Sequence, residues 1–242
     1  MSRGPRILRF ASPDATAEAA ARAVAAAADA ARAEGGVFQV ALAGGSTPAS
    51  MYTRLAAMID DWTGIRLWLG DERMVPPTDP DSNARMVATT LLAHLPPDRP
   101  TPLEEVRTDL APGQAARDYA DRIRTALGRS GGSPVLDMVI LGIGEDGHTA
   151  SLFPDRPDLT AAPPDAVVTA VADAPKPPPD RVTLTLATLN AARSRLILAT
   201  GPAKAPALDR LAADTEDPHW PITLVERTGT DVYTDQDVGL AP

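Results

Sequence analysis

Residues 137–154, with the sequence DMVILGIGEDGHTASLFP, constrain the fold of this chain more than any other stretch. Met138 to Leu141 are apolar and predict a buried strand. Three glycines between positions 142 and 147 then end the strand, because glycine permits tight turns and close approach of the backbone. Asp146 and His148 lie in or beside this turn. Open α/β sheets place their chemistry where buried strands end, so the segment predicts such a sheet with a functional site at its edge.

The same glycines, GIGEDG at 142–147, also fit the GxGxxG pattern of dinucleotide-binding proteins. That pattern requires a long helix directly after the glycines and an acidic residue about 20 positions further on. Pro154 and Pro157 interrupt the segment that follows and leave room for only a short helix. The sequence therefore disfavours a dinucleotide site, and a turn with structural glycines alone does not account for the acid and the imidazole beside them.

Apolar strands and periodic helices alternate along the rest of the chain. Strands are predicted at 37–43, 65–69, 167–171, 196–199, 222–225 and 232–234. Helices are predicted at 13–34 (capped by Ser12), 49–59, from 81–83 to 92, at 111–127 and after Lys204 to 213. Connections are predicted at 94–108, 128–133 and, as a stiff extended loop, 175–181. This alternation predicts an α/β fold with a mainly parallel sheet and helices on both faces, in a single domain 1–242 without internal repeats.

Composition excludes several classes of function. The net charge is −9, which disfavours a nucleic-acid or anionic-membrane surface and requires that any anionic substrate be held by cations gathered locally. There are no cysteines, hence no disulfide and no thiol chemistry. The N-terminus lacks an apolar signal core, and the alanine-rich run 15–33 carries too many charges to span a membrane. A cytoplasmic protein is expected.

The segment GGSTP at 44–48 joins a predicted strand to a predicted helix. A helix N-terminus presents free N–H groups and the positive end of its dipole, and Ser46 and Thr47 add two hydroxyls, so this turn suits a phosphate. The alternative is a plain strand-to-helix turn in which Ser46 or Thr47 caps the helix.

Three further charged segments lie at the ends of apolar segments. Asp71–Arg73 and Lys204 follow predicted strands, and Arg181 begins an apolar segment. Asp71 to Arg73 are either a solvated charge cluster or part of a site, and their position directly after a strand favours the site. Arg181 follows a stiff proline-rich stretch that is either a linker or a means of holding the arginine still. Lys204 is one of two lysines against 21 arginines (23 less 2), which suggests that a compact ammonium is required there. Four of the candidate segments each follow a predicted buried strand, and in a parallel sheet such strand ends lie on one edge and can converge: Ser46 and Thr47, Asp71 to Arg73, Asp146 to His148, and Lys204.

At these residues the chain resembles the 6-phosphogluconolactonase family. The matching segments are GGSTP (44–48), DER (71–73), SN (82–83), LGIGEDGHTASLFP (141–154), KPPPDRVTLT (176–185) and GPAKA (201–205). The resemblance implies hydrolysis of 6-phospho-D-glucono-1,5-lactone to 6-phosphogluconate, the second step of the oxidative pentose phosphate pathway. It also implies the fold of glucosamine-6-phosphate isomerase/deaminase. The implied substrate- and phosphate-binding residues are Gly44, Gly45, Ser46, Thr47, Asp71, Arg73, Asn83, Gly144, Arg181 and Lys204.

The resemblance also implies that His148 is the general base, and the chemistry of the residues agrees with this. Imidazole has an unperturbed pKa of about 6.5, so it can accept a proton from water near neutral pH, whereas a helix cap or a surface imidazole would be the alternative role. Asp146 is expected to orient the site. A lactone needs no cofactor for its hydrolysis. Three histidines and no cysteines make a metal site unexpected.

Two other functions are compatible with parts of the pattern. An isomerase/deaminase of amino-sugar phosphates would use a carboxylate base at Asp71, but those relatives resemble DEY and DGHIAFNEP where this chain has DER and DGHTASLFP. A non-enzymatic sugar-phosphate sensor would have no need of His148. The expected partner is therefore a small phosphosugar lactone, bound by a monomer or weak homo-oligomer, with no nucleic acid and no membrane.

Overall fold

The computed structural model describes residues 4–95, 102–128, 134–163, 165–213 and 215–239. Its centre is a six-stranded sheet in which every neighbouring pair is parallel, in the order β1-β9-β8-β5-β2-β3. The strands are β1 (Arg6–Arg9), β2 (Phe38–Leu42), β3 (Ile65–Leu69), β5 (Met138–Gly142), β8 (Ser194–Ala199) and β9 (Thr230–Thr234). The predicted parallel α/β sheet is confirmed.

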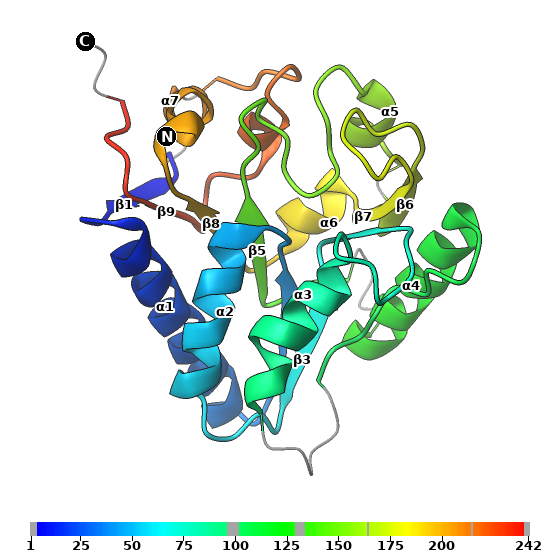
Figure 1. The fold of residues 1–242 in the computed structure, drawn as a ribbon, viewed down its shortest axis with the longest axis horizontal. Coiled ribbons are helices and arrows are strands. Elements are labelled where there is room, and N and C mark those ends of the chain that lie inside the picture. The colour runs from blue at the N-terminus through cyan, green and yellow to red at the C-terminus, as the bar shows by residue number, and fades with distance from the viewer. Residues whose placement is uncertain (1–3, 96–101, 129–133, 164, 214, 240–242) are drawn as a thin grey trace.

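Helices cover both faces of this sheet (Figure 1). On one face lie α1 (Pro13–Ala33), α2 (Ser46–Met58) and α3 (Asn83–Thr90), which share a core with Phe38, Val40 and Leu42. On the other lie α4 (Pro112–Leu127), α6 (Leu186–Ala191) and α7 (Ala205–Ala212). Shorter turns of helix are η1 (Leu92–His94), α5 (Pro157–Thr160), η2 (Pro202–Lys204) and η3 (Pro221–Leu224). No helix in the described ranges is both long and apolar enough to cross a membrane.

A second, antiparallel sheet of three strands was not predicted from the sequence. It contains β4 (Asp71–Arg73), β7 (Arg181–Leu184) and β6 (Val168–Val171), with β7 in the middle. The chain passes from the parallel sheet into this one at Gly70, whose N–H donates to Leu42 O (2.8 Å) and whose carbonyl accepts from Leu184 N (2.8 Å). Consequently Arg73 pairs directly with Arg181 in register, 108 positions apart.

Two other predictions and one omission require correction. Residues 222–225 are not a strand, because Pro221 has the fixed φ that starts a helical turn, and η3 forms there. The edge strand β1 was missed, since its sequence RILR is half arginine and only partly buried. Helix α2 begins at Ser46 rather than at residue 49, with Gly45 as its N-cap, so the alternative in which Ser46 or Thr47 caps this helix is wrong. The predicted connections at 96–101 and 129–133 lie outside the described residues.

The strands that precede the predicted site segments are neighbours in the sheet. In the order β8-β5-β2-β3 they run parallel, so their carboxyl ends share one edge. The segments after them, which carry Lys204, His148, the 44–47 turn and Asp71, therefore meet at that edge.

Candidate active site

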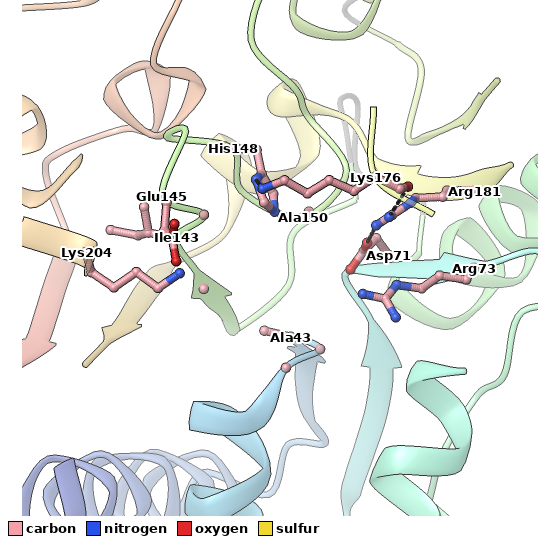
Figure 2. A pocket seen from close by; sticks show the side chains of 14 residues that line it. Ala43, Asp71, Arg73, Ile143, Glu145, His148, Ala150, Lys176, Arg181 and Lys204 are labelled. Carbon is pink, nitrogen blue, oxygen red and sulfur yellow. Dashed lines mark hydrogen bonds and ion pairs between the residues drawn. The ribbon is translucent and has the colours of Figure 1, made fainter. Parts of the chain in front are cut away.

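A cavity of about 340 Å³ opens at this edge of the parallel sheet (Figure 2). Of the predicted residues, those that line it are Gly44, Gly45, Asp71, Arg73, Gly144, His148, Arg181 and Lys204. Four predicted residues do not line the cavity: Asp146, Asn83, Ser46 and Thr47. Asp146 contacts the lining residue His148, and Asn83 contacts the lining residue Asp71. Four cationic side chains line the cavity against two carboxylates, so it concentrates positive charge within a chain whose net charge is −9: Arg73, Lys176, Arg181 and Lys204 against Asp71 and Glu145.

His148 and Asp146 form a hydrogen-bonded pair in the glycine turn after β5. The distance from His148 Nδ1 to Asp146 Oδ1 is 2.5 Å, and the ring packs against Phe153 with 5.1 Å between centroids. Because Nδ1 donates to the carboxylate, Nε2 is left as the basic nitrogen, and it has no hydrogen-bond partner among the described residues. The side chain of His148 is 21% exposed, which lets the ring face the cavity.

Gly144 makes this arrangement possible because the pair lies directly against its backbone. A Cβ atom at position 144 would be 2.0 Å from His148 Nδ1 and 2.4 Å from Asp146 Oδ1. The Gly144 N–H also donates to the His148 carbonyl at 2.8 Å and closes the turn. Any other residue at this position would push the imidazole away from its carboxylate.

Electrostatics keep Asp146 ionised and His148 neutral near pH 7. Burial acts to raise the pKa of Asp146, but the hydrogen bonds and charges of His148 and Lys176 outweigh it and hold the pKa at about 2. Burial is the main cause that lowers the pKa of His148 below 6.5; Asp146 acts to raise this pKa and Lys176 to lower it. A neutral imidazole fixed by an ionised carboxylate can remove a proton from a water molecule.

Lys176 is a member of this cluster that sequence reasoning did not assign to the site. Its Nζ lies 3.1 Å from Asp146 Oδ2 and 3.4 Å from His148 Nδ1. The sequence does carry a signal, since Lys176 is one of the two lysines and heads the KPPPDR segment, but the pattern predicts that segment as either a linker or a support for Arg181.

The relation between Arg181 and the proline loop is the reverse of that interpretation. The Arg181 guanidinium donates to the carbonyls of Lys176 (2.9 Å), Pro177 (3.4 Å) and Pro178 (3.1 Å), so the arginine holds the loop. Its side chain is 4% exposed and lies over the ring of Phe153 at 5.3 Å. Arg181 Nη1 is 3.9 Å from Asp71 Oδ2 at the cavity wall.

Asp71 and Arg73 of the DER segment both line the cavity, and each has partners of its own. Asp71 accepts hydrogen bonds from Ser151 Oγ (2.6 Å) and Asn83 Nδ2 (3.2 Å), and Asn83 also donates to the Asp71 carbonyl (2.8 Å). Arg73 Nη1 donates to Asp81 O (2.6 Å), and its buried Nε has no hydrogen-bond partner within the described ranges. Asn83 packs directly against Gly44, and only glycine permits this, since a Cβ atom at position 44 would lie 2.2 Å from Asn83 Oδ1.

The far end of the cavity consists of Lys204 and the start of α2. Figure 2 shows Lys204 on the opposite side of the cavity from Arg73 and Arg181, with His148 and Lys176 between them. The N-cap Gly45 provides no side-chain hydrogen bond, so the first N–H groups of α2 have no capping side chain. Thr47 Oγ1 is 3.1 Å from Thr200 Oγ1, which ties this helix end to the segment that carries Lys204.

Known proteins share both this sequence and this fold. Residues 11–234 match the family described as glucosamine-6-phosphate isomerases/6-phosphogluconolactonase. The chain belongs to this family. A 6-phosphogluconolactonase from Homo sapiens is 40% identical over 200 residues, covering 78% of this chain and 74% of the human protein. One from Synechocystis is 35% identical over 212 residues, covering 86% of this chain and 85% of that protein.

Solved structures agree with the family assignment. The 6-phosphogluconolactonase from Trypanosoma cruzi superposes with a TM-score of 0.83 at 29% identity, covering 97% of this chain and 95% of that one. A monomeric glucosamine-6-phosphate deaminase has a TM-score of 0.77 at 19% identity, which shows a shared fold only. The expected family, the expected fold and the expectation of a 6-phosphogluconolactonase-type enzyme are confirmed by these relatives.

Proposed function

We propose that this protein hydrolyses 6-phospho-D-glucono-1,5-lactone to 6-phospho-D-gluconate, with His148 as the general base. One observation carries the proposal. An imidazole whose Nδ1 is held by a carboxylate faces a cavity that is also lined by Arg73, Lys176 and Lys204. The relatives named 6-phosphogluconolactonase support the same reaction.

In the proposed mechanism, Nε2 of His148 removes a proton from water as the oxygen attacks the lactone carbonyl carbon. The bond between that carbon and the ring oxygen then breaks, and the imidazolium returns the proton to the departing oxygen. One water is consumed, and an acid and an alcohol are formed. Asp146 keeps the ring in the required tautomer and stabilises its transient charge. General base catalysis of this kind contributes roughly 100- to 10,000-fold.

The cations are proposed to divide between the two ends of the substrate. Lys204 and the uncapped N–H groups of α2 suit the phosphate, because a helix N-terminus and an ammonium both favour a dianion. Arg73 and Lys176 lie on the side of His148 away from Lys204, where they suit the carbonyl oxygen and its developing negative charge (Figure 2). Phosphate binding would then hold the lactone carbon near the base.

The rival deaminase chemistry requires Asp71 as a base, and its surroundings do not favour that role. Asp71 is buried, and its carboxylate already accepts from Ser151 and Asn83. Asp71 therefore suits the support of the cavity wall.

Acid release from the lactone, measured above the spontaneous rate, tests the proposal. The parent protein is expected to accelerate release, and His148→Ala is expected to lose about 100- to 10,000-fold of the enzymatic rate while still binding the phosphosugar. His219→Ala is the matched control, because His219 is exposed and pairs with Asp155 away from the cavity lining. Lactone hydrolysis by His148→Ala at the parental rate would refute the base, and ammonia release from glucosamine 6-phosphate would favour the rival.

The proposal includes the remaining expectations from the sequence. Residues 1–242 would form one domain of this type, acting in the cytoplasm on a small phosphosugar lactone as a monomer or weak homo-oligomer. No nucleic acid, membrane, cofactor or metal takes part in the proposed reaction.

A further inference from the structure

We propose that Lys176 is a positioning residue of this site, whose ammonium holds the Asp146 carboxylate against Nδ1 of His148. The inference rests on the proposed function only in its consequence for the rate, because the contact itself is a property of the folded chain.

The first support is the division of the Asp146 carboxylate between two partners. Its Oδ1 accepts from His148 Nδ1 at 2.5 Å, and its Oδ2 accepts from Lys176 Nζ at 3.1 Å. A carboxylate held at both oxygens cannot rotate freely about its terminal bond. Lys176 therefore contributes to the orientation of the imidazole through Asp146, without needing to touch the substrate.

The second support is the contact between Lys176 and the imidazole itself. Nζ lies 3.4 Å from His148 Nδ1, and both are donors when Nδ1–H is bound to Asp146. An ammonium at this distance repels an imidazolium and tolerates a neutral ring. Asp146 orients the imidazole but by itself would favour the protonated ring, and the charge of Lys176 opposes that protonation.

The third support is the way the loop is held. Arg181 donates to three successive carbonyls of residues 176–178, and its guanidinium lies over Phe153, the same ring that packs against His148. Arg181 thus fixes the backbone of Lys176 and also contacts Phe153, whose ring packs against His148. The lysine side chain is 47% exposed and extends from this anchored backbone toward His148 (Figure 2). Its ammonium reaches Asp146 Oδ2 there.

Several charged groups surround the imidazole. Among the residues that the structure describes, only Asp146 and Lys176 have charged atoms within hydrogen-bond distance of the ring. Asp71 on β4 acts on it through space and favours protonation. The charged residues that share the cavity lining with His148 are Asp71, Arg73, Glu145, Lys176, Arg181 and Lys204. Burial is the largest single influence and favours the neutral ring, with Lys176 acting in the same direction.

The test is a pH titration of the histidine ring resonances by NMR, on the parent, Lys176→Met and Lys176→Arg. The chain has three histidines, so His148→Ala and His219→Ala assign all the signals. Loss of the ammonium in Lys176→Met should raise the titration midpoint of His148, because the repulsion of the imidazolium is gone. Lys176→Arg keeps the charge and should restore the parental midpoint. Lys204→Met removes the other lysine, which has no contact with Asp146, and should shift the midpoint less.

The same variants are then assayed for lactone hydrolysis across pH. The base must be unprotonated, so a higher midpoint moves the acid limb of kcat/KM to higher pH in Lys176→Met, and its deficit is largest at low pH. An unchanged His148 midpoint in Lys176→Met, or an equal shift in Lys204→Met, would overturn the inference. Absence of hydrolysis by the parent would refute the proposed function alone, because the NMR result stands independently of it.

Discussion

Glu72 and Asp146 are both acids that follow strands of the parallel sheet, β3 and β5, and both lie in segments singled out by their sequence. Glu72 is 1% exposed and accepts hydrogen bonds from the backbone N–H groups of Arg73 (2.7 Å), Asn83 (2.8 Å) and Ala84 (2.7 Å). Ser82 Oγ adds a fourth donor at 3.2 Å. The side chain of Asp146 is 33% exposed, and His148 and Lys176 occupy its two oxygens.

The surroundings of Glu72 make it a structural group. Its carboxylate lies at the N-terminus of α3, where it binds N–H groups that have no partner within the helix. Burial raises the pKa of Glu72, and the three backbone hydrogen bonds oppose this rise. A carboxylate saturated by backbone donors has no free oxygen with which to act on a substrate.

The surroundings of Asp146 are suited to chemistry for the opposite reason. Its partners are side chains, and one of them, the His148 ring, has a second nitrogen that faces a cavity. The comparison therefore teaches that the two acids differ in the kind of partner they have, in addition to burial and the number of hydrogen bonds. What the partners can do with their remaining atoms is the deciding property.

The largest effect on either acid is expected from Gly144→Ala, which should separate Asp146 from His148. Its new Cβ would overlap His148 Nδ1 at 2.0 Å, so the pair must separate and kcat should fall by about 100- to 10,000-fold, as for loss of the base. Thermal stability should change little, because both side chains are partly exposed and can move. Gly113→Ala is the control, since its nearest contact is 3.8 Å away at a flexible arginine end. Retention of parental kcat in Gly144→Ala would contradict the assignment.

Glu72→Ala should lower the stability of the fold, in contrast to the loss of activity expected at the Asp146–His148 pair. It leaves two buried N–H groups and one partly buried N–H group without their acceptor, and should lower the free energy of unfolding by about 3–5 kcal/mol. For a domain of this size that corresponds to a decrease in Tm of roughly 10 °C. Glu105→Ala, at an exposed glutamate, serves as the control in calorimetry. A Tm within 2 °C of the parent, taken as roughly the scale of a 1 kcal/mol change, would show that Glu72 is not a structural cap.

Lys204→Ala should produce a smaller effect, on substrate binding rather than on kcat or stability. Lys204 belongs to neither acidic cluster, and within the described part of the chain it forms no ion pair. If it holds the phosphate, its loss should raise KM roughly 10- to 100-fold, the value of one charge-assisted hydrogen bond, with kcat nearly unchanged. Steady-state kinetics separate the two constants, and an effect confined to kcat would contradict a phosphate role.

Much of the candidate site could be predicted because it depends on local pattern. The apolar run Met138–Leu141 and the glycines after it were sufficient to predict a strand end with His148 at its edge. The alternation of strands and helices was sufficient to bring four such ends together. The strand predicted at 222–225 failed because Pro221, at the start of a short apolar run, favours a helical turn over a strand.

By itself, then, the sequence determined the parallel α/β sheet, the edge at which its functional segments meet and the imidazole that lies there, since these follow from periodicity and from residues near one another in the chain. Only the tertiary structure decided the division of DER into a wall residue, a helix cap and a cavity cation, and the entry of Lys176 into the cluster. The cap role of Glu72 depends on its contacts with residues 82–84. The places of Asp71, Arg73 and Lys176 depend on the antiparallel pairing of β4 with β7 and on the contacts of Arg181. Such pairings join residues more than 100 positions apart, and no local pattern encodes which loops will meet.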